Sequence, residues 1–208
     1  DSTAQVPAAA PVAALPDTAD ASRTQLGYRP GHDTTFLIGQ QRYRLLLRAE
    51  TDSTKPLVTV TEGIVGSFYA EDTASFERTH RVRGYEGSQL ITLLDPAGRQ
   101  VFQRRLRKPD WYAVAGRDIV TVSQPERPRF IGYHAPSQTL FFTVMVGIPD
   151  SDVWRNCVLT LGLDGRVRHL AAGRWTGGEG ANCEARLLAD GTLLNCEELR
   201  RPDGRTVR

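Results

Sequence analysis

Three cysteines and one histidine are the side chains of this chain best suited to bind a metal ion together: Cys157, Cys183, Cys196 and His169. A structural zinc site needs four ligands that converge in a tetrahedron, usually from closely spaced pairs. The sequence contains no Cys-x-x-Cys pair. An expected hairpin also pairs His169 with Thr160, which places Cys157 and His169 on opposite faces of that hairpin. We therefore expect no metal and no other cofactor.

The same cysteines could form one disulfide bond. Cys183 and Cys196 flank Asp190-Gly191, which is a tight-turn sequence. A two-residue turn there pairs Cys196 with Ala185 and leaves Cys183 on a diagonal of about 7–8 Å, which is beyond the usual reach of a disulfide. A bulge or a longer loop would bring the two together, and Cys183 could instead reach Cys157. We expect one disulfide that joins Cys183 to Cys157 or to Cys196.

Two loops could hold a ligand. A glycine-rich loop could bind an anion through its backbone amides, and the tryptophan beside it could stack on a sugar. The loop lacks the lysine of a P-loop and the spacing of a dinucleotide-binding turn. A pair of aspartates could begin a calcium site, although calcium takes 6–8 oxygen ligands and turn capping is the commoner role. The candidate ligand-binding residues are therefore Trp175, Gly177, Gly178, Gly180, Asp150 and Asp152.

The sequence shows no catalytic signature. It has no Gly-x-Ser-x-Gly motif, and none of its four histidines has an evident nucleophile partner in sequence, though partners could meet in space. The arginine-rich segments 78–83 and 99–107 could form a basic face for acidic glycans or lipid headgroups, but such a stripe is more often a solvated sheet face. The net charge of +2 is too small to indicate nucleic-acid binding.

The apolar run Leu140–Val146 is the stretch around which the fold is organised. A strand with one wet face alternates apolar and polar residues, so a run without alternation indicates cover on both faces. The run is too short and too rich in Phe and Val to favour a buried helix. With the repeated turn signals it predicts an all-β fold: an antiparallel sandwich or open barrel built from hairpins, with at most one or two short helical turns.

The turn after the next strand predicts a strand register. Asp164-Gly165 between apolar runs favours a two-residue type I′ hairpin, which needs positive φ at both positions. The expected partners are Leu163 with Arg166, Leu161 with Arg168, Thr160 with His169, and Leu159 with Leu170.

Two further hairpins are expected before the core strand. The first turns at Gly39-Gln40 and the second at residues 95–98. In the second, Pro96 at the second turn position and Gly98 at the fourth suit a type I turn that closes in a bulge.

Three other segments have local signals. Residues 52–56 are predicted to form a turn and residues 118–122 a strand. Asp110 is predicted to cap one helical turn through Trp111–Val114.

Residues 1–27 differ in composition from the rest of the chain. They are rich in alanine and interrupted by prolines, and such a segment buries too little apolar area to offset its ordering entropy. We predict a disordered linker or tether over residues 1–27 and a single β domain over residues 28–208.

The order of segments resembles a family of uncharacterised bacterial cell-envelope lipoproteins, known as a domain of unknown function. The resemblance rests on the N-terminal tail and on the motifs TFLIGQQRYRL, LITLLDPAGRQVFQRRL, LFFTVMVGIPDSD and LTLGLDGRV, over roughly residues 34–167. It implies a periplasmic or cell-surface β protein, tethered by a lipid on a cysteine just before Asp1. No catalytic residue is carried over.

These observations favour a non-catalytic binding or assembly module for an envelope protein or a glycan. Membrane contact is expected only through the lipid anchor, and no nucleic acid is expected. The alternative is a glycan or ester hydrolase whose site combines side chains of several strands. That alternative predicts a deep cleft with at least two carboxylates, with Glu197 and Glu198 as candidates.

Overall fold

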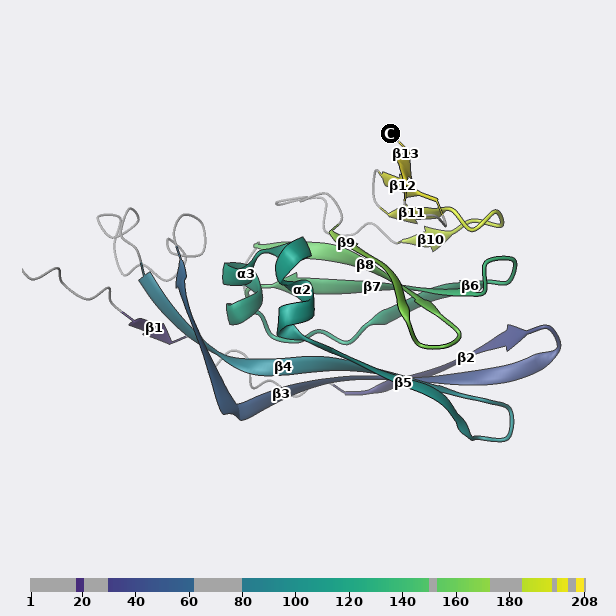
Figure 1. The fold of residues 1–208 in the computed structure, drawn as a ribbon, viewed down its shortest axis with the longest axis horizontal. Coiled ribbons are helices and arrows are strands. Elements are labelled where there is room, and N and C mark those ends of the chain that lie inside the picture. The colour runs from purple at the N-terminus through teal and green to yellow at the C-terminus, as the bar shows by residue number, and fades with distance from the viewer. Residues whose placement is uncertain are drawn as a thin grey trace, which may run out of the picture.

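A computed structural model of the chain describes residues 18–20, 30–61, 80–149, 153–172, 185–195, 198–201 and 205–207. The described strands form three sheets, which lie as layers in Figure 1. Sheet A is the lower layer, sheet B lies above it, and sheet C lies above sheet B at the upper right. The all-β sandwich predicted from the sequence is confirmed, and sheets A to C do not close into a barrel within these residues.

Sheet A has the strand order β1-β4-β3-β2, and β5 also pairs with β4. All its pairs are antiparallel except β1 with β4. The hairpin between β2 and β3 turns at Gly39-Gln40 as predicted, because Ile38 pairs with Gln41. The strands are β1 (Thr18–Asp20), β2 (His32–Ile38), β3 (Gln41–Thr61), β4 (His80–Leu94) and β5 (Gln100–Arg107).

Strand β1 falls inside the segment predicted to be a linker. It pairs with residues Arg81–Arg83 of β4. The other residues of the segment 1–27 lie outside the described part of the chain, so the linker stays a prediction for them.

Sheet B has the order β6-β7-β8-β9, and its central strand β7 is covered on both faces, as predicted. Leu140, Phe142 and Val144 belong to the core shared with sheet A, whereas Phe141 packs toward sheet C. The cover ends at Met145, which is 46% exposed. The strands are β6 (Arg129–His134), β7 (Thr139–Gly147), β8 (Trp154–Gly162) and β9 (Val167–Ala172).

Sheet C attaches to sheet B through a small apolar contact and one buried arginine. Leu193 packs with Phe141 and Val158. Arg200 donates from Nη2 to the carbonyl oxygen of Ala172 at 2.9 Å. Its strands are β10 (Arg186–Leu187), β11 (Leu193–Asn195), β12 (Glu198–Arg200) and β13 (Thr206–Val207).

The main core lies between the inner face of sheet A and sheet B. Its members from sheet A are fully or almost fully buried. They alternate along their strands with residues that point to the other face, as the two-residue period of a strand requires. These inner-face residues are Leu45, Leu47, Ile91, Leu93, Phe102 and Leu106.

Two short helices close one end of the sandwich: α2 (Lys108–Ala115) and α3 (Arg117–Val122). Trp111 of α2 is 1% exposed, and its Nε1 donates to Oε1 of Gln89 on β4 at 3.0 Å. The strand predicted at 118–122 is wrong, because this segment is α3. Its β-branched residues favour a strand locally, but Val120 and Val122 are buried in the packed helix, and tertiary burial outweighs that weak preference.

The turn at Asp164-Gly165 differs from the predicted type I′ turn. The amide of Gly162 donates to the Arg166 carbonyl oxygen at 3.0 Å, which encloses three loop residues rather than two. Only Gly165, with φ of 74°, has positive φ in this loop. The geometry is that of a type I turn closed by a glycine bulge.

The longer loop changes the register next to it. Leu161 pairs with Val167 instead of Arg168, and the predicted pair Leu163–Arg166 does not form. An irregularity between Thr160 and Leu161 then restores the ladder. The predicted pairs Thr160 with His169 and Leu159 with Leu170 are therefore confirmed.

Two further glycine turns, at residues 95–98 and at Asp190-Gly191, have the same geometry. At residues 95–98 the Gly98 amide donates to the Asp95 carbonyl oxygen at 2.9 Å, and the predicted type I turn with a bulge is confirmed. At Asp190-Gly191 the Leu188 amide bonds to the Thr192 carbonyl oxygen at 2.8 Å. The register predicted there from a two-residue turn is wrong by one position, since Leu187 pairs with Leu193.

Candidate functional site

The outer face of sheet A, which points away from sheet B, carries the candidate site. Strand pairing fixes which residues share this face. Glu50 of β3, Ser88 of β4 and Arg107 of β5 lie in one row across the sheet, because Ser88 pairs with both of the others. In the next row Asp52 pairs with Glu86. Residues that are paired across strands point to the same side, so these charged groups gather on one surface.

An irregularity in β3 opens this surface into a groove. Asp52 pairs with Glu86 and Pro56 with Tyr85, so the three residues between Asp52 and Pro56 have no counterpart on β4. The turn predicted at 52–56 is therefore wrong. The chain does not reverse there, because β3 pairs with β4 both before and after this segment. The extra residues bulge out of the strand and form one wall of the groove.

Asp52 holds this bulge together. Its carboxylate accepts the backbone N–H of Thr54 at 3.1 Å and forms an ion pair with Lys55 Nζ at 2.8 Å. The hydrogen bonds from Lys55 and then Thr54 lower the pKa of Asp52 to about 2. The group is ionised at neutral pH and organises the loop.

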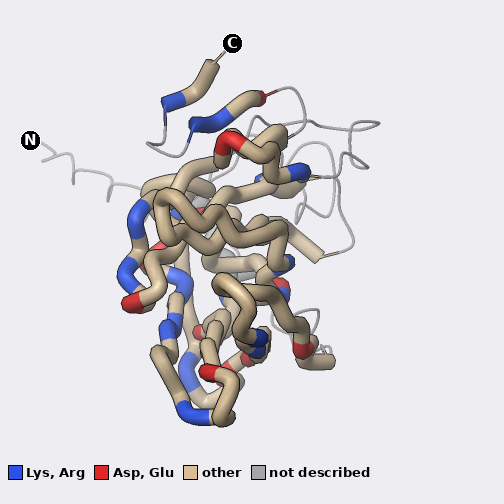
Figure 2. Tube along the Cα trace, turned by 90° about the vertical axis from the view of Figure 1, so that its right-hand side faces the viewer, with Lys and Arg blue, Asp and Glu red and all other residues tan. Residues whose placement is uncertain are grey.

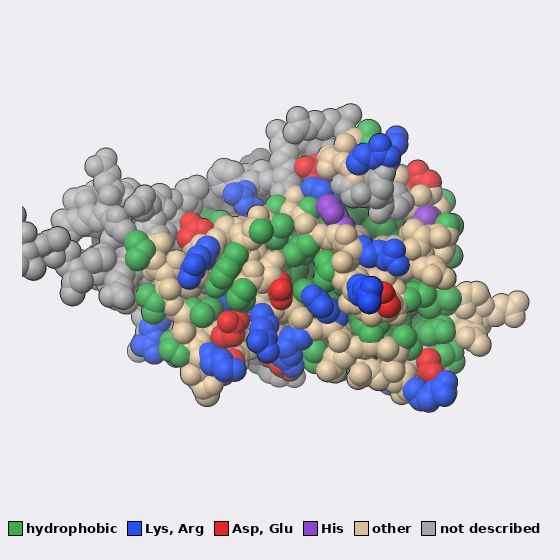
Figure 3. All heavy atoms as spheres, in the orientation of Figure 1, with side chains coloured by type: hydrophobic (Ala, Val, Ile, Leu, Met, Phe, Trp, Pro, Cys, Tyr) green, Lys and Arg blue, Asp and Glu red, His purple; other side chains and the backbone are tan. Residues whose placement is uncertain are grey.

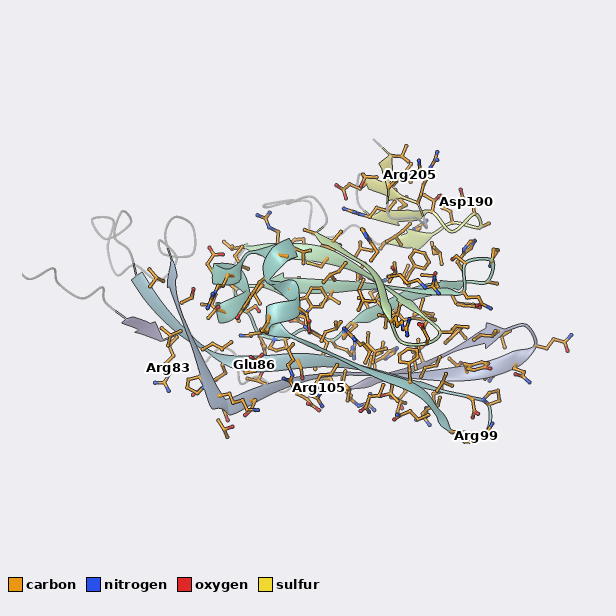
Figure 4. The ribbon with its side chains drawn as sticks, viewed as in Figure 1. Arg83, Glu86, Arg99, Arg105, Asp190 and Arg205 are labelled. Atoms are coloured by element: carbon orange, nitrogen blue, oxygen red, sulfur yellow. The ribbon has the colours of Figure 1, made fainter. Side chains whose placement is uncertain are left out.

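The groove has a volume of about 690 Å³, within the range of small-ligand sites. Figure 4 shows two of its members, Glu86 and Arg105, on the neighbouring strands β4 and β5. We call it the outer groove. Its lining residues are Glu50, Thr51, Asp52, Ser53, Lys55, Glu86, Gly87, Ser88, Arg105 and Arg107.

An ion pair crosses over β4 at one end of the outer groove. Arg105 Nη1 lies 2.8 Å from Glu50 Oε2 and donates to Ser88 Oγ at 2.7 Å. Arg105 and Glu50 remain 42% and 53% exposed, so the pair contributes at most about 1 kcal/mol to stability. Its main effect is to fix the direction of the Arg105 guanidinium, which keeps further N–H donors for a ligand.

Glu86 and Arg107 carry the charges at the other end. Glu86 Oε1 accepts the backbone N–H of Gly87 at 3.0 Å and that of Lys108 at 3.4 Å. The Arg107 side chain is exposed and forms no ion pair with any described residue. These two groups therefore keep most of their capacity for an external partner.

Behind this end of the groove lies a buried lysine. Lys108 is 3% exposed, and its Nζ donates to the carbonyl oxygen of Thr121, in the last turn of α3, at 2.7 Å. Burial lowers the pKa of Lys108 to about 7, although the nearby Glu86 carboxylate opposes this shift. Lys108 thus ties α2 to α3 directly behind Glu86.

A second ionic cluster lies on the same face, nearer the β2–β3 hairpin. Asp33 of β2 accepts from Arg44 and lies 2.9 Å from Arg48 Nη2. The hydrogen bonds from Arg44 and Arg48 lower the pKa of Asp33. Figures 2 and 3 show basic and acidic residues interspersed over the lower part of the molecule. The arginine-rich face expected from segment 99–107 therefore contains acids as well as bases.

The ligand-binding candidates from the sequence are not tested by the structure. All six lie outside the described residues, so none can be placed relative to the outer groove: Trp175, Gly177, Gly178, Gly180, Asp150 and Asp152.

The disulfide prediction is wrong for one of its two pairings. Cys157 is a free, fully buried thiol, and burial raises its pKa to about 12. The bond from Cys183 to Cys157 is therefore not formed. Cys183 and Cys196 both lie outside the described residues, so that pairing stays a prediction.

No metal site is present in the described part of the chain, where no group of three or more His, Cys, Asp or Glu side chains lies close enough to hold an ion. His169 instead lies 3.3 Å from Arg200 Nη1, and burial followed by the Arg200 charge lowers its pKa. Of the two hydrolase candidates, Glu198 forms an ion pair with Arg200 at 3.1 Å. Glu197 lies outside the described residues.

Sequence reasoning missed the outer groove. Its acids and bases come from three strands, and each looks like an ordinary solvated sheet residue in sequence. The signal that could have located it is the Asp-Ser-Thr-Lys-Pro segment at 52–56, where the strand pattern is interrupted between two β-rich runs. That interruption was interpreted as the end of a strand rather than as a bulge within one.

No helix in the described residues is long and apolar enough to cross a membrane. No family model matches the chain. No curated protein was found to be similar to it.

Proposed function

We propose that this protein is a non-catalytic binding module that holds a protein partner in the outer groove of sheet A. The observation that carries the proposal is the collection of opposite charges and hydroxyl groups from three strands in one groove of about 690 Å³. Arg105 is already oriented by Glu50 and Ser88, and a preorganised side chain loses less entropy when a partner binds.

The lining favours a polypeptide over a glycan. Sugar faces commonly stack on aromatic rings, and none of the groove's ten lining residues is aromatic. Peptide segments supply carboxylates, ammonium groups and backbone amides, which match the bases, acids and hydroxyls of this groove.

Two carboxyl groups of the outer face favour binding over hydrolysis. A general acid needs a carboxyl group whose pKa is raised toward neutrality. In the groove, Lys55 and Thr54 lower the pKa of Asp52 to about 2. On the same face, Arg44 and Arg48 lower the pKa of Asp33. Both carboxylates are therefore ionised at neutral pH and paired with neighbouring cations.

The same proposal places the module at the cell envelope, tethered by a lipid upstream of Asp1. What supports it is the resemblance to envelope lipoproteins and the alanine- and proline-rich residues 1–27. An intact-mass measurement on protein taken from its native membrane tests this part. A mass that matches the bare polypeptide would contradict the anchor.

Site-specific photocrosslinking in native cells tests the groove. A photoreactive residue at Ser53, in the groove wall, should give a discrete crosslinked polypeptide. The same residue at Ala113, exposed on α2, is the matched control and should give none. Arg105→Glu should abolish the Ser53 product. Equal products at both positions, or a product that resists protease and is digested by glycosidases, would contradict a protein partner in this groove.

A further inference from the structure

The outer groove contains two ion pairs, and within each pair the two charges neutralise each other. Glu50 lies 2.8 Å from Arg105, and Asp52 lies 2.8 Å from Lys55. A ligand that approached either pair would have to compete with a charge already in place. These four residues shape the groove but contribute little net charge to recognition.

Two charges in the groove remain after these pairs are removed. Arg107 forms no ion pair with any residue in the described ranges, and the Glu86 carboxylate accepts only backbone N–H groups there. Lys108 is the cation behind Glu86, but its Nζ donates to Thr121, and its pKa of about 7 leaves it only partly charged at neutral pH. The groove thus presents one positive and one negative group that still need partners.

Strand pairing places these two groups close together. Arg107 pairs with Ser88, and Glu86 lies two residues before Ser88 on the same face. They are therefore diagonal neighbours, with backbones roughly 7–8 Å apart. The carboxylate of Glu86 also reaches the backbone N–H of Lys108, the residue after Arg107, at 3.4 Å.

Resting on the proposed function, we infer that the outer groove recognises a polypeptide segment in which an acidic and a basic side chain lie on the same side of an extended chain. The ligand's carboxylate would bind Arg107 in a two-bond contact, which guanidinium groups favour. Its ammonium or guanidinium group would bind Glu86. A ligand with one sign of charge would satisfy one group and leave the other desolvated and unpaired, which is the usual source of discrimination against it.

Fluorescence anisotropy with the full chain and four labelled peptides of equal length tests this inference. The peptides place at every second position, with glycine between, alternating Lys and Glu, only Glu, only Lys, or only Ser. The alternating peptide should bind at least about tenfold more tightly than the other three. Equal affinity for all four, or strongest binding of a single-charge peptide, would overturn the inference.

Variants of the two groups sharpen the test. Arg107→Gln and Glu86→Gln should each weaken binding of the alternating peptide by about tenfold, and the second keeps an oxygen that can accept the Gly87 amide. Arg107→Glu should make the lysine peptide the preferred ligand. Arg42→Gln, an exposed arginine on the same face but outside the groove, is the control and should change nothing. The inference would also be overturned if the Arg107→Glu variant melts like the wild type and still prefers the alternating peptide.

The two proposals fail separately. If the Ser53 crosslink forms and depends on Arg105 but the four peptides bind alike, the groove binds a protein by some other chemistry and only this inference is wrong. If the crosslink is absent as well, the proposed function is wrong.

Discussion

The two faces of sheet A are built from the same strands and are held together in different ways. On the inner face Leu45, Leu47, Ile91 and Leu93 are fully buried against sheet B. The outer face carries several ion pairs between side chains that are about half exposed, such as Arg105 with Glu50. Buried apolar area dominates folding energy, whereas exposed ion pairs contribute little. The inner face therefore determines stability, and the outer face is free to be used for recognition.

The largest expected effect is on the inner face. Leu47→Ala removes a fully buried side chain from the main core and should lower the free energy of unfolding by about 2–5 kcal/mol. Denaturant unfolding followed by fluorescence measures this. At temperatures where the variant stays folded, the Ser53 crosslink should be unchanged. A loss below about 0.5 kcal/mol would show that the inner face is not the main source of stability.

An intermediate effect is expected at Lys108, the buried lysine behind the outer groove. Its pKa is about 7 in the folded chain against 10.5 in the unfolded chain. Between these values the unfolded chain holds the proton and the folded chain does not, so stability should rise with pH, and below about pH 7 the dependence should vanish. The full rise corresponds to at most roughly 5 kcal/mol.

Comparison with a variant isolates this contribution. Lys108→Met should be more stable than the wild type at pH 6, and the difference should shrink as the pH rises toward 10. Lys55 is the other lysine of the chain, and Lys55→Met is the matched control because Lys55 is exposed on the outer face. A pH profile of Lys108→Met that parallels the wild type would show that Lys108 keeps an ordinary pKa.

The smallest expected effect is on the outer face. Arg44→Ala breaks the exposed contact with Asp33 and should change the free energy of unfolding by less than about 1 kcal/mol, with the difference decreasing at high salt. Thermal melts at low and high ionic strength measure this. A decrease in the free energy of unfolding as large as that caused by Leu47→Ala would show that the two faces do not differ in their contribution to stability.

The main core was largely predictable from the sequence, because it depends on local periodicity. The unbroken apolar run of Leu140–Val146 indicated a strand covered on both faces, and Phe141 and Phe142 do pack on opposite sides. The exact register was less predictable. Asp164-Gly165 is compatible with loops of two or three residues, and the loop adopted depends on how the flanking strands pack.

The outer groove was not predictable, because its parts are brought together only by pairing between distant strands. Glu50 and Arg105 are 55 residues apart, and neither local sequence shows that the two side chains meet. Helix α3 was missed for a related reason. Its Val120 and Val122 suit a strand locally, and only their burial beneath the packed helix pair shows otherwise.

Because of the bulge after Asp52, the number of residues in β3 does not determine the register in which β3 pairs with β4. Because the ladder resumes at Pro56 opposite Tyr85, directly beside the pair of Asp52 and Glu86, residues 53–55 can be lengthened, shortened or replaced without sliding any other residue along β4. The protein therefore has a segment in which selection or an engineer can change what the surface binds without changing the strand register on either side.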